Sequence, residues 1–330
     1  MPSQARVIEM KTLVRIALLL YLLGLPTIAD AATCFWVGGT GTWNNSTDTA
    51  FWKSTSGGGT ACAATGGVPK NAGDIATFDG ASGGGTITIN VDVNIAQITA
   101  GAFTGTLDWS AHNNAVTLST AFNGSGSGTR TINLGNGIWT FTATSGTPWQ
   151  MTTTTGLTFN ANSSTLVFTA TTASTRTFQS GQLNYNIVTV SANSSGGAFL
   201  YVGGQTTATF NITAPNAVGF QGTTTLTNAP TWTGASGSLI SLSSQALGTT
   251  ATISVASGTS SNNFVGIRDL TFSGGAIFTA INCYDLGHNS GVTCTAPATG
   301  GGGRIIGGWL LRRDLYHNND NNLAWLEKVA

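Results

Sequence analysis

Charged residues are scarce in this chain. Only 7% of its 330 residues are Asp, Glu, Lys or Arg, whereas ordinary globular proteins contain about 25%. The formal net charge is zero, so the composition gives no indication of a surface that captures nucleic acid or an anionic membrane. Neutral polar residues and 45 glycines take the place of charge. This composition favours a fibrous fold with a neutral polar surface.

Carboxylates are missing from the centre of the chain. No Asp or Glu occurs between Asp108 and Asp269. The charged residues of that stretch are three arginines, Arg130, Arg176 and Arg268. Glycoside hydrolysis generally requires two carboxylates about 5 to 10 Å apart, and lyase chemistry requires a base with cationic or metal assistance. The sequence therefore predicts a protein that is not an enzyme and that holds no cofactor and no metal.

Helical periodicity is absent from residues 85–282. In residues 86–90, Ile87 and Ile89 would lie on one face of an extended strand, and Thr and Asn side chains on the other. Runs rich in Gly, Asn and Ser separate such segments, because these residues adopt turn conformations at little cost. The same period of two recurs at residues 116–119, 131–134, 138–141, 166–168, 187–190, 199–202, 209–212 and 252–255.

A short repeat suggests stacked coils. The Thr-Arg-Thr-Ile sequence of residues 129–132 returns 46 positions later as Thr-Arg-Thr-Phe. Two coils of about 23 residues would place both copies on one face of a solenoid, although a chance match is the alternative. Stacked Thr and Asn side chains could hydrogen-bond between coils. Three prolines are expected at strand edges, where a missing N–H costs no ladder bond: Pro148, Pro215 and Pro230.

These patterns predict an all-β fold, an elongated right-handed parallel β-helix (β-solenoid) with an N-terminal cap and a short C-terminal tail. The expected divisions are a signal peptide at residues 1–31, a Trp-rich cap at 32–85, a solenoid body at 86–297, and a Gly hinge with the tail at 298–330.

The N-terminal residues predict export. They contain a basic start, an apolar run at residues 16–25 and an Ala-Asp-Ala cleavage site at residues 29–31, which is the layout of a secretory signal peptide. The apolar run is shorter than the ~20 residues that span a bilayer. We expect a mature chain that begins near Ala32, has no transmembrane span after cleavage, and is secreted to the exterior, the cell surface or a virion.

The four cysteines agree with export, because an even number favours disulfides in a secreted chain. Of three possible connectivities, we favour those that close short local loops, since cross-pairing would require the two ends of the body to meet. A zinc site is an alternative without a C-x-x-C spacing to support it, and lipidation of the first cysteine is disfavoured by the Thr before it. The favoured pairs are Cys34 with Cys62 and Cys283 with Cys294.

The most distinctive motifs lie between Cys34 and Gly85. The sequence Trp-Val-Gly-Gly-Thr-Gly-Thr-Trp occupies residues 36–43, a further Trp-containing pair follows, then Val-Pro at 68–69 and an Asp-x-x-x-Phe-Asp element at 74–79. With these motifs the chain resembles secreted and phage-encoded β-solenoid proteins, parallel β-helices of the pectate-lyase-like or autotransporter-passenger-like kind. Residues 269–291 are similar to a terminal coil of that group. The resemblance implies a solenoid in an extracellular or virion setting and supplies no catalytic residues.

Three tryptophans mark the N-terminal end of the predicted core. A stacked-coil fold leaves its first layer uncovered and needs a capping element, so a cap is the favoured interpretation. An aromatic platform on which sugar rings stack is the alternative. The residues concerned are Trp36, Trp43 and Trp52.

Other polar residues are weaker candidates. Three aspartates could ligate calcium, but their spacing matches no calcium loop and Asx turns are favoured: Asp74, Asp79 and Asp92. A second group could act as a base or bind a metal: Asp285, His288 and Asn289. His112 is interpreted as a turn residue.

After Pro297 the composition changes. A glycine run at residues 300–303 predicts a flexible hinge, and the residues after it carry much of the mature charge. We predict a docking or capping tail with apolar anchors and a charged rim, a disordered terminus being the alternative. The anchors are Trp309, Leu310 and Leu311, and the rim is Arg312 and Arg313.

The predicted function is that of a non-catalytic extracellular structural or adhesive solenoid, associated with a cell surface or a phage virion as a fibre or appendage. A carbohydrate-binding or polysaccharide-degrading β-helix protein is the alternative. The expected partners are a cell-surface polysaccharide or neighbouring subunits, a homo-oligomer included, and not nucleic acid.

Overall fold

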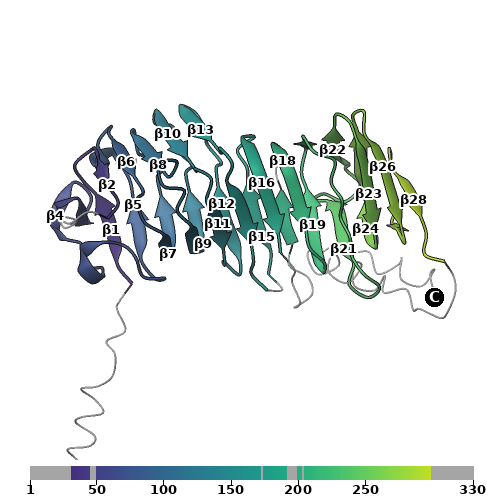
Figure 1. Ribbon diagram of the computed structural model, residues 1–330, viewed down its shortest axis with the longest axis horizontal. Helices are drawn as coiled ribbons and strands as arrows, with labels where there is room; N and C mark the ends of the chain where they lie inside the picture. Colours follow the sequence, from purple (N-terminus) through teal and green to yellow (C-terminus); the bar gives the residue numbers. More distant parts are fainter. Residues whose placement is uncertain (1–30, 45–49, 172–173, 192–198, 203, 299–330) are drawn as a thin grey trace, which may run out of the picture.

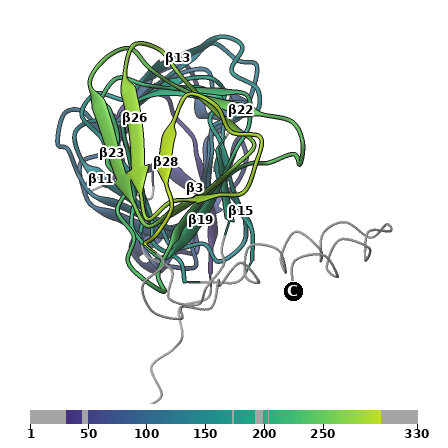
Figure 2. The same ribbon diagram turned by 90° about the vertical axis from the view of Figure 1, so that its right-hand side faces the viewer.

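The chain forms an elongated stack of coils whose first and last strands lie at opposite ends (Figure 1). The computed structural model describes residues 31–44, 50–171, 174–191, 199–202 and 204–298. Successive coils superimpose around a common interior when the stack is seen from its end (Figure 2). Nearly every strand pairs in parallel with its counterpart in the next coil, so the predicted β-solenoid is confirmed.

The coils build three sheets, and the largest contains 20 strands. Its members are β1 (Thr33–Trp36), β3 (Trp52–Thr55), β4 (Gly58–Ala61), β5 (Ile75–Thr77), β7 (Val93–Thr99), β9 (Val116–Asn123), β11 (Ile138–Phe141), β12 (Gly146–Gln150), β14 (Thr165–Phe168), β15 (Arg176–Gln179), β16 (Asn184–Val190), β17 (Phe199–Val202), β18 (Gln205–Ile212), β19 (Asn216–Phe220), β20 (Thr223–Leu226), β21 (Ile240–Ser244), β22 (Ala251–Val255), β24 (Val265–Arg268), β25 (Leu270–Ser273) and β27 (Tyr284–Asp285).

The two smaller sheets cover different stretches of the stack, one toward the N-terminal end and one toward the C-terminal end (Figure 1). The five-stranded sheet is made of β2 (Gly41–Thr42), β6 (Thr86–Thr88), β8 (Thr106–Asp108), β10 (Arg130–Asn133) and β13 (Leu157–Asn160). The three-stranded sheet is made of β23 (Thr259–Asn263), β26 (Ile277–Ile281) and β28 (Thr293–Thr295). Two short 3-10 helices, η2 (Thr65–Gly67) and η3 (Gly80–Ser82), lie near the N-terminal end.

The large sheet turns a corner within single long strands. The first residues of β9 pair with β11 and its last residues pair with β12, so one strand serves two sides of the coil. β18 pairs with β16 of the preceding coil over almost its whole length, and its first residues pair with β20 of the following coil. The corner in β9 is one place where the 20-stranded sheet passes from one side of a coil to another.

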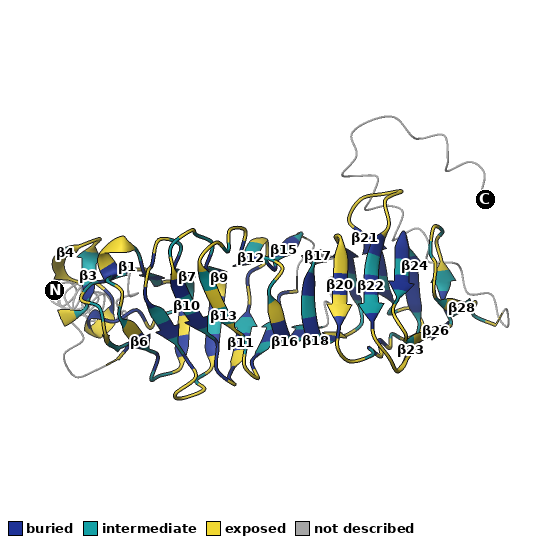
Figure 3. Ribbon diagram, turned by 90° about the horizontal axis from the view of Figure 1, so that it is seen from above, coloured by how far each residue is buried: buried dark blue, intermediate teal, exposed yellow. Residues whose placement is uncertain are grey.

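Alternation of apolar and polar residues explains which side chains are inside. Ile87, Leu107 and Ile132 align in register across β6, β8 and β10, and all three are fully buried. Figure 3 shows the same alternation of buried and exposed residues along the stack. Burial of apolar surface contributes about 25 cal/mol per Å², so each coil gains most of its stability by covering its neighbours.

Parallel stacking begins earlier than the predicted cap boundary at residue 85. β1 pairs in parallel with β5, and β2 pairs in parallel with β6. Only β3 and β4 run antiparallel in this region, β3 against both β1 and β4. The N-terminal cap is therefore a hairpin added to the first coil, and not a separate layer before it.

The predicted repeat of the Thr-Arg-Thr motif on one face is wrong. Arg130 lies in β10 of the five-stranded sheet, whereas Arg176 lies in β15 of the large sheet, so the two copies occupy different faces. Coil length also varies along the stack. Val202 aligns with Phe220 and Trp149 aligns with Phe178, and the second of these steps spans a much longer stretch of chain. Turns of different length absorb this variation, which a constant period cannot describe.

The prolines follow the expectation only in part. Pro215 and Pro230 lie between strands. Pro148 instead lies inside β12, where the register with β15 shifts between Gly146 and Trp149. Proline is tolerated inside a strand at such an irregularity, because the ladder is already interrupted there.

Two disulfides close the two ends of the stack, with the predicted connectivity. Cys34 is bonded to Cys62 and Cys283 to Cys294, with Cα–Cα distances of 5.3 and 5.4 Å. The described part of the chain contains no helix with the length and apolar character that a membrane crossing requires.

Candidate functional site

The three N-terminal tryptophans are inside the molecule. Trp36, Trp43 and Trp52 are each at most 1% exposed. Trp36 stacks on Phe51 with ring centroids 4.7 Å apart, and Trp52 packs edge-on against both other tryptophans. Each indole N–H donates to a backbone carbonyl. No ring face of these three is open to a sugar, so their arrangement agrees with the capping interpretation and excludes the platform.

The three N-terminal aspartates accept backbone hydrogen bonds. Asp79 caps η3, where Ala81 N donates to its carboxylate. Asp92 accepts from Ala115 N at 2.9 Å, and Asp74 accepts from three backbone N–H groups. These are turn and anchoring roles. Across the described ranges, no three His, Cys, Asp or Glu side chains gather closely enough to hold a metal ion.

His288 pairs with a residue that the sequence did not suggest. Its Nδ1 lies 2.9 Å from Asp269 Oδ1, and the side chains are 76% and 2% exposed respectively. Asp285 instead accepts from Gly287 N and Asn289 Nδ2. Asp269 and His288 both have left-handed backbone conformations, with φ of 55°, and lie one coil apart. The pairing could be predicted only with knowledge of the length of that coil. The pair joins two neighbouring coils.

The two buried arginines of the body differ in their hydrogen bonds. The Arg130 guanidinium donates to four carbonyls, those of Gly124, Gly128, Thr153 and Thr155. These carbonyls come from two successive coils. Burial lowers the pKa of Arg130. Arg130 thus acts as a bridge inside the stack, and its charge is hidden from the surface.

Arg176 is fully buried and its three guanidinium nitrogens have no hydrogen-bond partner. Burial lowers its pKa also. The third arginine of the body, Arg268, has a side chain that is 17% exposed and lies 3.5 Å from Asp269. The solvent-facing surface between Asp108 and Asp269 is therefore almost free of charge.

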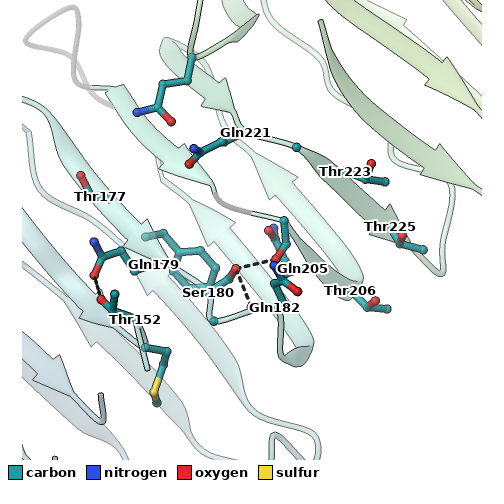
Figure 4. Close-up of a pocket in the computed structure, with 16 residues that line it drawn as sticks. Thr152, Thr177, Gln179, Ser180, Gln182, Gln205, Thr206, Gln221, Thr223 and Thr225 are labelled. Atoms are coloured by element: carbon teal, nitrogen blue, oxygen red, sulfur yellow. Dashed lines mark hydrogen bonds between the residues drawn. The ribbon is translucent and has the colours of Figure 1, made fainter. Parts of the chain in front are cut away.

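A groove lies where the large sheet passes into the turns that precede β18 and β20. This corner groove has a volume of about 770 Å³ and is lined by 16 residues, none of them charged. Strands β15, β18 and β20, the two residues that follow β12 and the turns near these strands supply its walls. Figure 4 labels ten of the lining side chains. Five of the lining residues are glutamines: Gln179, Gln182, Gln205, Gln221 and Gln245.

Some of the groove's polar groups are already paired. Thr152 Oγ1 donates to Gln179 Oε1 at 2.6 Å, and Ser180 Oγ donates to the Gly204 carbonyl at 2.8 Å. Gln205 is only 4% exposed, yet neither its Oε1 nor its Nε2 has a hydrogen-bond partner. A buried amide without a partner costs about 1 to 3 kcal/mol. Sequence reasoning missed this site, because its glutamines come from different coils and share no motif.

The anchors and rim at residues 309–313, like the signal peptide up to residue 30, lie outside the described residues. The corner groove is the remaining candidate for recognition. Amide and hydroxyl side chains can donate and accept hydrogen bonds together, which suits a neutral ligand rich in hydroxyl groups. Comparison with protein-family models, with curated proteins and with solved structures gives no match to this chain.

Proposed function

We propose that this chain is an exported structural or adhesive β-solenoid without catalytic activity, displayed on a cell surface or on a phage particle. The observation that carries the proposal is the surface of its body. Stacked parallel strands present Thr, Ser and Asn along the stack, while Arg130 and Arg176 are buried inside it.

A rigid, neutral rod suits a role as a spacer or contact module. In the described part of the chain, strands of the large sheet pair with strands of neighbouring coils along the whole stack, so few of their backbone segments are open to proteases. The disulfides Cys34–Cys62 and Cys283–Cys294 close the two ends, and such bonds persist in oxidising compartments outside the cytoplasm. The resemblance in the N-terminal motifs points to the same setting.

Localisation and activity together test this proposal. The full chain is expressed in a secreting host and followed by antibody labelling of intact cells and by analysis of the medium. We expect the protein outside the cytoplasm, resistant to proteases, and without release of reducing ends or unsaturated products from polysaccharides. Retention in the cytoplasm would contradict the export, and turnover that is lost in His288→Ala or Asp285→Ala would contradict the non-catalytic role.

The corner groove favours a second candidate, recognition of a neutral glycan. Gln221 and Gln245 are exposed at its rim, and the buried Gln205 amide has unmet hydrogen-bonding capacity. Sugar hydroxyls are both donors and acceptors, as are amides. The volume lies within the roughly 300 to 1,000 Å³ typical of ligand sites, although no exposed aromatic ring lines the walls as a stacking face.

Binding of neutral oligosaccharides to the immobilised chain tests this candidate. We expect Gln221→Ala with Gln245→Ala to weaken binding at least about tenfold, since each lost polar contact changes affinity by about 1 kcal/mol. Gln97→Ala is the matched control, because Gln97 lies on β7, outside the groove, and its side chain bonds to Thr99. Equal binding by both variants would place the ligand elsewhere or exclude it.

A further inference from the structure

A buried carboxylate holds the backbone nitrogen at which the mature chain is expected to begin. Asp74 is fully buried, and its Oδ1 accepts a hydrogen bond from Ala32 N at 3.0 Å. Its Oδ2 accepts from Lys70 N at 3.0 Å and from Asn71 N at 2.9 Å. All three donors are neutral backbone amides.

No cation is paired with this carboxylate within the described ranges. The ion pairs there involve Asp269, with Arg268 and with His288. The Lys70 ammonium is directed toward the turn of η2, since a Cβ on Gly66 would lie 3.0 Å from Lys70 Nζ. A buried carboxylate without a countercharge is costly. Among the described residues, Asp74 therefore has no positively charged partner.

Signal-peptide cleavage would supply that partner. The Ala-Asp-Ala motif ends at Ala31 and predicts cleavage of the Ala31–Ala32 peptide bond. Hydrolysis by a signal peptidase consumes one water, leaves a carboxylate on Ala31 and releases the Ala32 nitrogen as an amine, which takes a proton from solvent to become an ammonium. The nitrogen that now donates to Asp74 as a neutral amide would then carry the positive charge.

We propose that processing between Ala31 and Ala32 creates a buried ion pair between the new N-terminal ammonium and Asp74, which locks the first coil after export. The inference rests on the proposed export for the cleavage itself. The pairing depends only on the geometry at Ala32, and it can be tested in a chain made to begin there.

Contacts with residues later in the chain hold Ala32 in place. The Ala32 carbonyl accepts from Ile75 N at 2.8 Å, and the next residues of β1 continue the ladder with β5. Ala32 is 7% exposed, whereas Ala31 is exposed. Gly73 leaves room for Ala31, because a Cβ there would lie 2.9 Å from the Ala31 Cβ. Loss of Ala31 therefore removes an exposed residue and leaves the ladder intact.

A charge-assisted hydrogen bond is shorter and about twice as strong as a neutral one. The pair would tie β1 to the turn before β5, beside the Cys34–Cys62 disulfide. The unprocessed chain can fold with the neutral hydrogen bond, and the processed chain gains the charged one. Cleavage of the signal peptide, which releases the protein from the membrane, would thus also stabilise the first coil.

The test compares two mature chains that differ only at the N-terminus. One begins at Ala32, and the other carries Gly-Ser-Ala before Ala32. Both chains are released by the same protease from the same fusion partner. Each is also made with the substitution Asp74→Asn. We expect the amides of β1 and β5 to exchange with deuterium at least about tenfold more slowly in the chain that begins at Ala32. The difference should disappear in Asp74→Asn.

Equal exchange in the two chains, or a difference that persists in Asp74→Asn, would overturn the proposal. Should Asp74→Asn fail to fold, acylation of the α-amine decides in the unsubstituted chains. A paired, buried Ala32 amine should react at least about tenfold more slowly than the amine of the extended chain, and equal rates would overturn the pairing.

The position of signal-peptide cleavage is measured separately. Mass spectrometry of the secreted protein should find Ala32 as the first residue, and a different first residue would overturn the site of cleavage. A chain that is never exported would contradict the proposed export, while the comparison of the two purified chains would still decide the pairing.

Discussion

At the scale of single residues, contacts between coils determine what each position does. Arg130 and Arg176 occur in the same Thr-Arg-Thr context and are both buried. The Arg130 guanidinium donates hydrogen bonds to four carbonyls, whereas the Arg176 guanidinium has no hydrogen-bond partner. Gly126 is another example, since a Cβ there would overlap the Gly101 carbonyl of the preceding coil. Such contacts join residues that are about one coil apart, and coil length is not visible in a local motif.

The two arginines should respond in opposite directions to replacement by methionine, which keeps the apolar stem and removes the charge. Arg130→Met leaves the carbonyls of Gly124, Gly128 and Thr153 without this donor, and should lower the free energy of unfolding by about 2 to 4 kcal/mol. Arg176→Met removes an unpaired buried charge, and should raise it by about 1 to 3 kcal/mol. Urea denaturation midpoints measure both changes.

The opposite signs are the discriminating result, because each variant serves as the control for the other. A loss of stability in Arg176→Met similar to that in Arg130→Met would mean that the Arg176 guanidinium finds hydrogen-bond acceptors in solution.

At the scale of elements, each of the nine segments with a period of two falls on a strand of the body, and the other body strands were not predicted in this way. Ile87 and Ile89 are both buried as expected, because a strand between two neighbouring coils leaves one face inside. The irregular elements were not predictable in this way. Pro148 lies inside β12. The hairpin of β3 and β4 depends on antiparallel pairing, which no local sequence pattern indicates.

The candidate site was less predictable than the fold. The buried tryptophans and the disulfides could be predicted, because Trp is large, Cys is rare, and each has few structural roles. The corner groove is lined by glutamines such as Gln179 and Gln221, which belong to a common surface residue type and come from different coils, so no local motif connects them. The Asp269–His288 pair has the same origin.

The C-terminal disulfide should stabilise one element and not the whole stack. Cys283–Cys294 closes a loop with a sequence separation of 11, which corresponds to about 2 to 3 kcal/mol on a chain-entropy estimate. β28 is paired with β26 alone, so replacing both cysteines by serine should release it. Deuterium exchange should rise in β28 and β26 and stay unchanged in β14. Faster exchange along the entire stack would contradict this local role.

At the scale of the whole molecule, the fold is nearly one-dimensional. Each coil contacts its two neighbours, so stability is approximately a sum of coil and interface contributions, and the ends need covering. At the N-terminal end, the hairpin of β3 and β4 and three buried tryptophans provide this cover. The proposed Ala32–Asp74 ion pair would strengthen the same end, and the Cys283–Cys294 disulfide closes the other.

The tail after Thr299 provides the last prediction, because its composition differs from that of the neutral stack. If it docks on a partner or on a neighbouring subunit, deleting it should leave the thermal midpoint of the solenoid nearly unchanged and abolish assembly or surface retention. Trp309→Ser in the full-length chain should have the same effect, since large apolar anchors supply most of the affinity in small interfaces. Calorimetry and light scattering measure the two properties separately. A midpoint lower by many degrees would show that the tail is an end cap, and a truncated protein that still assembles or stays attached would exclude docking.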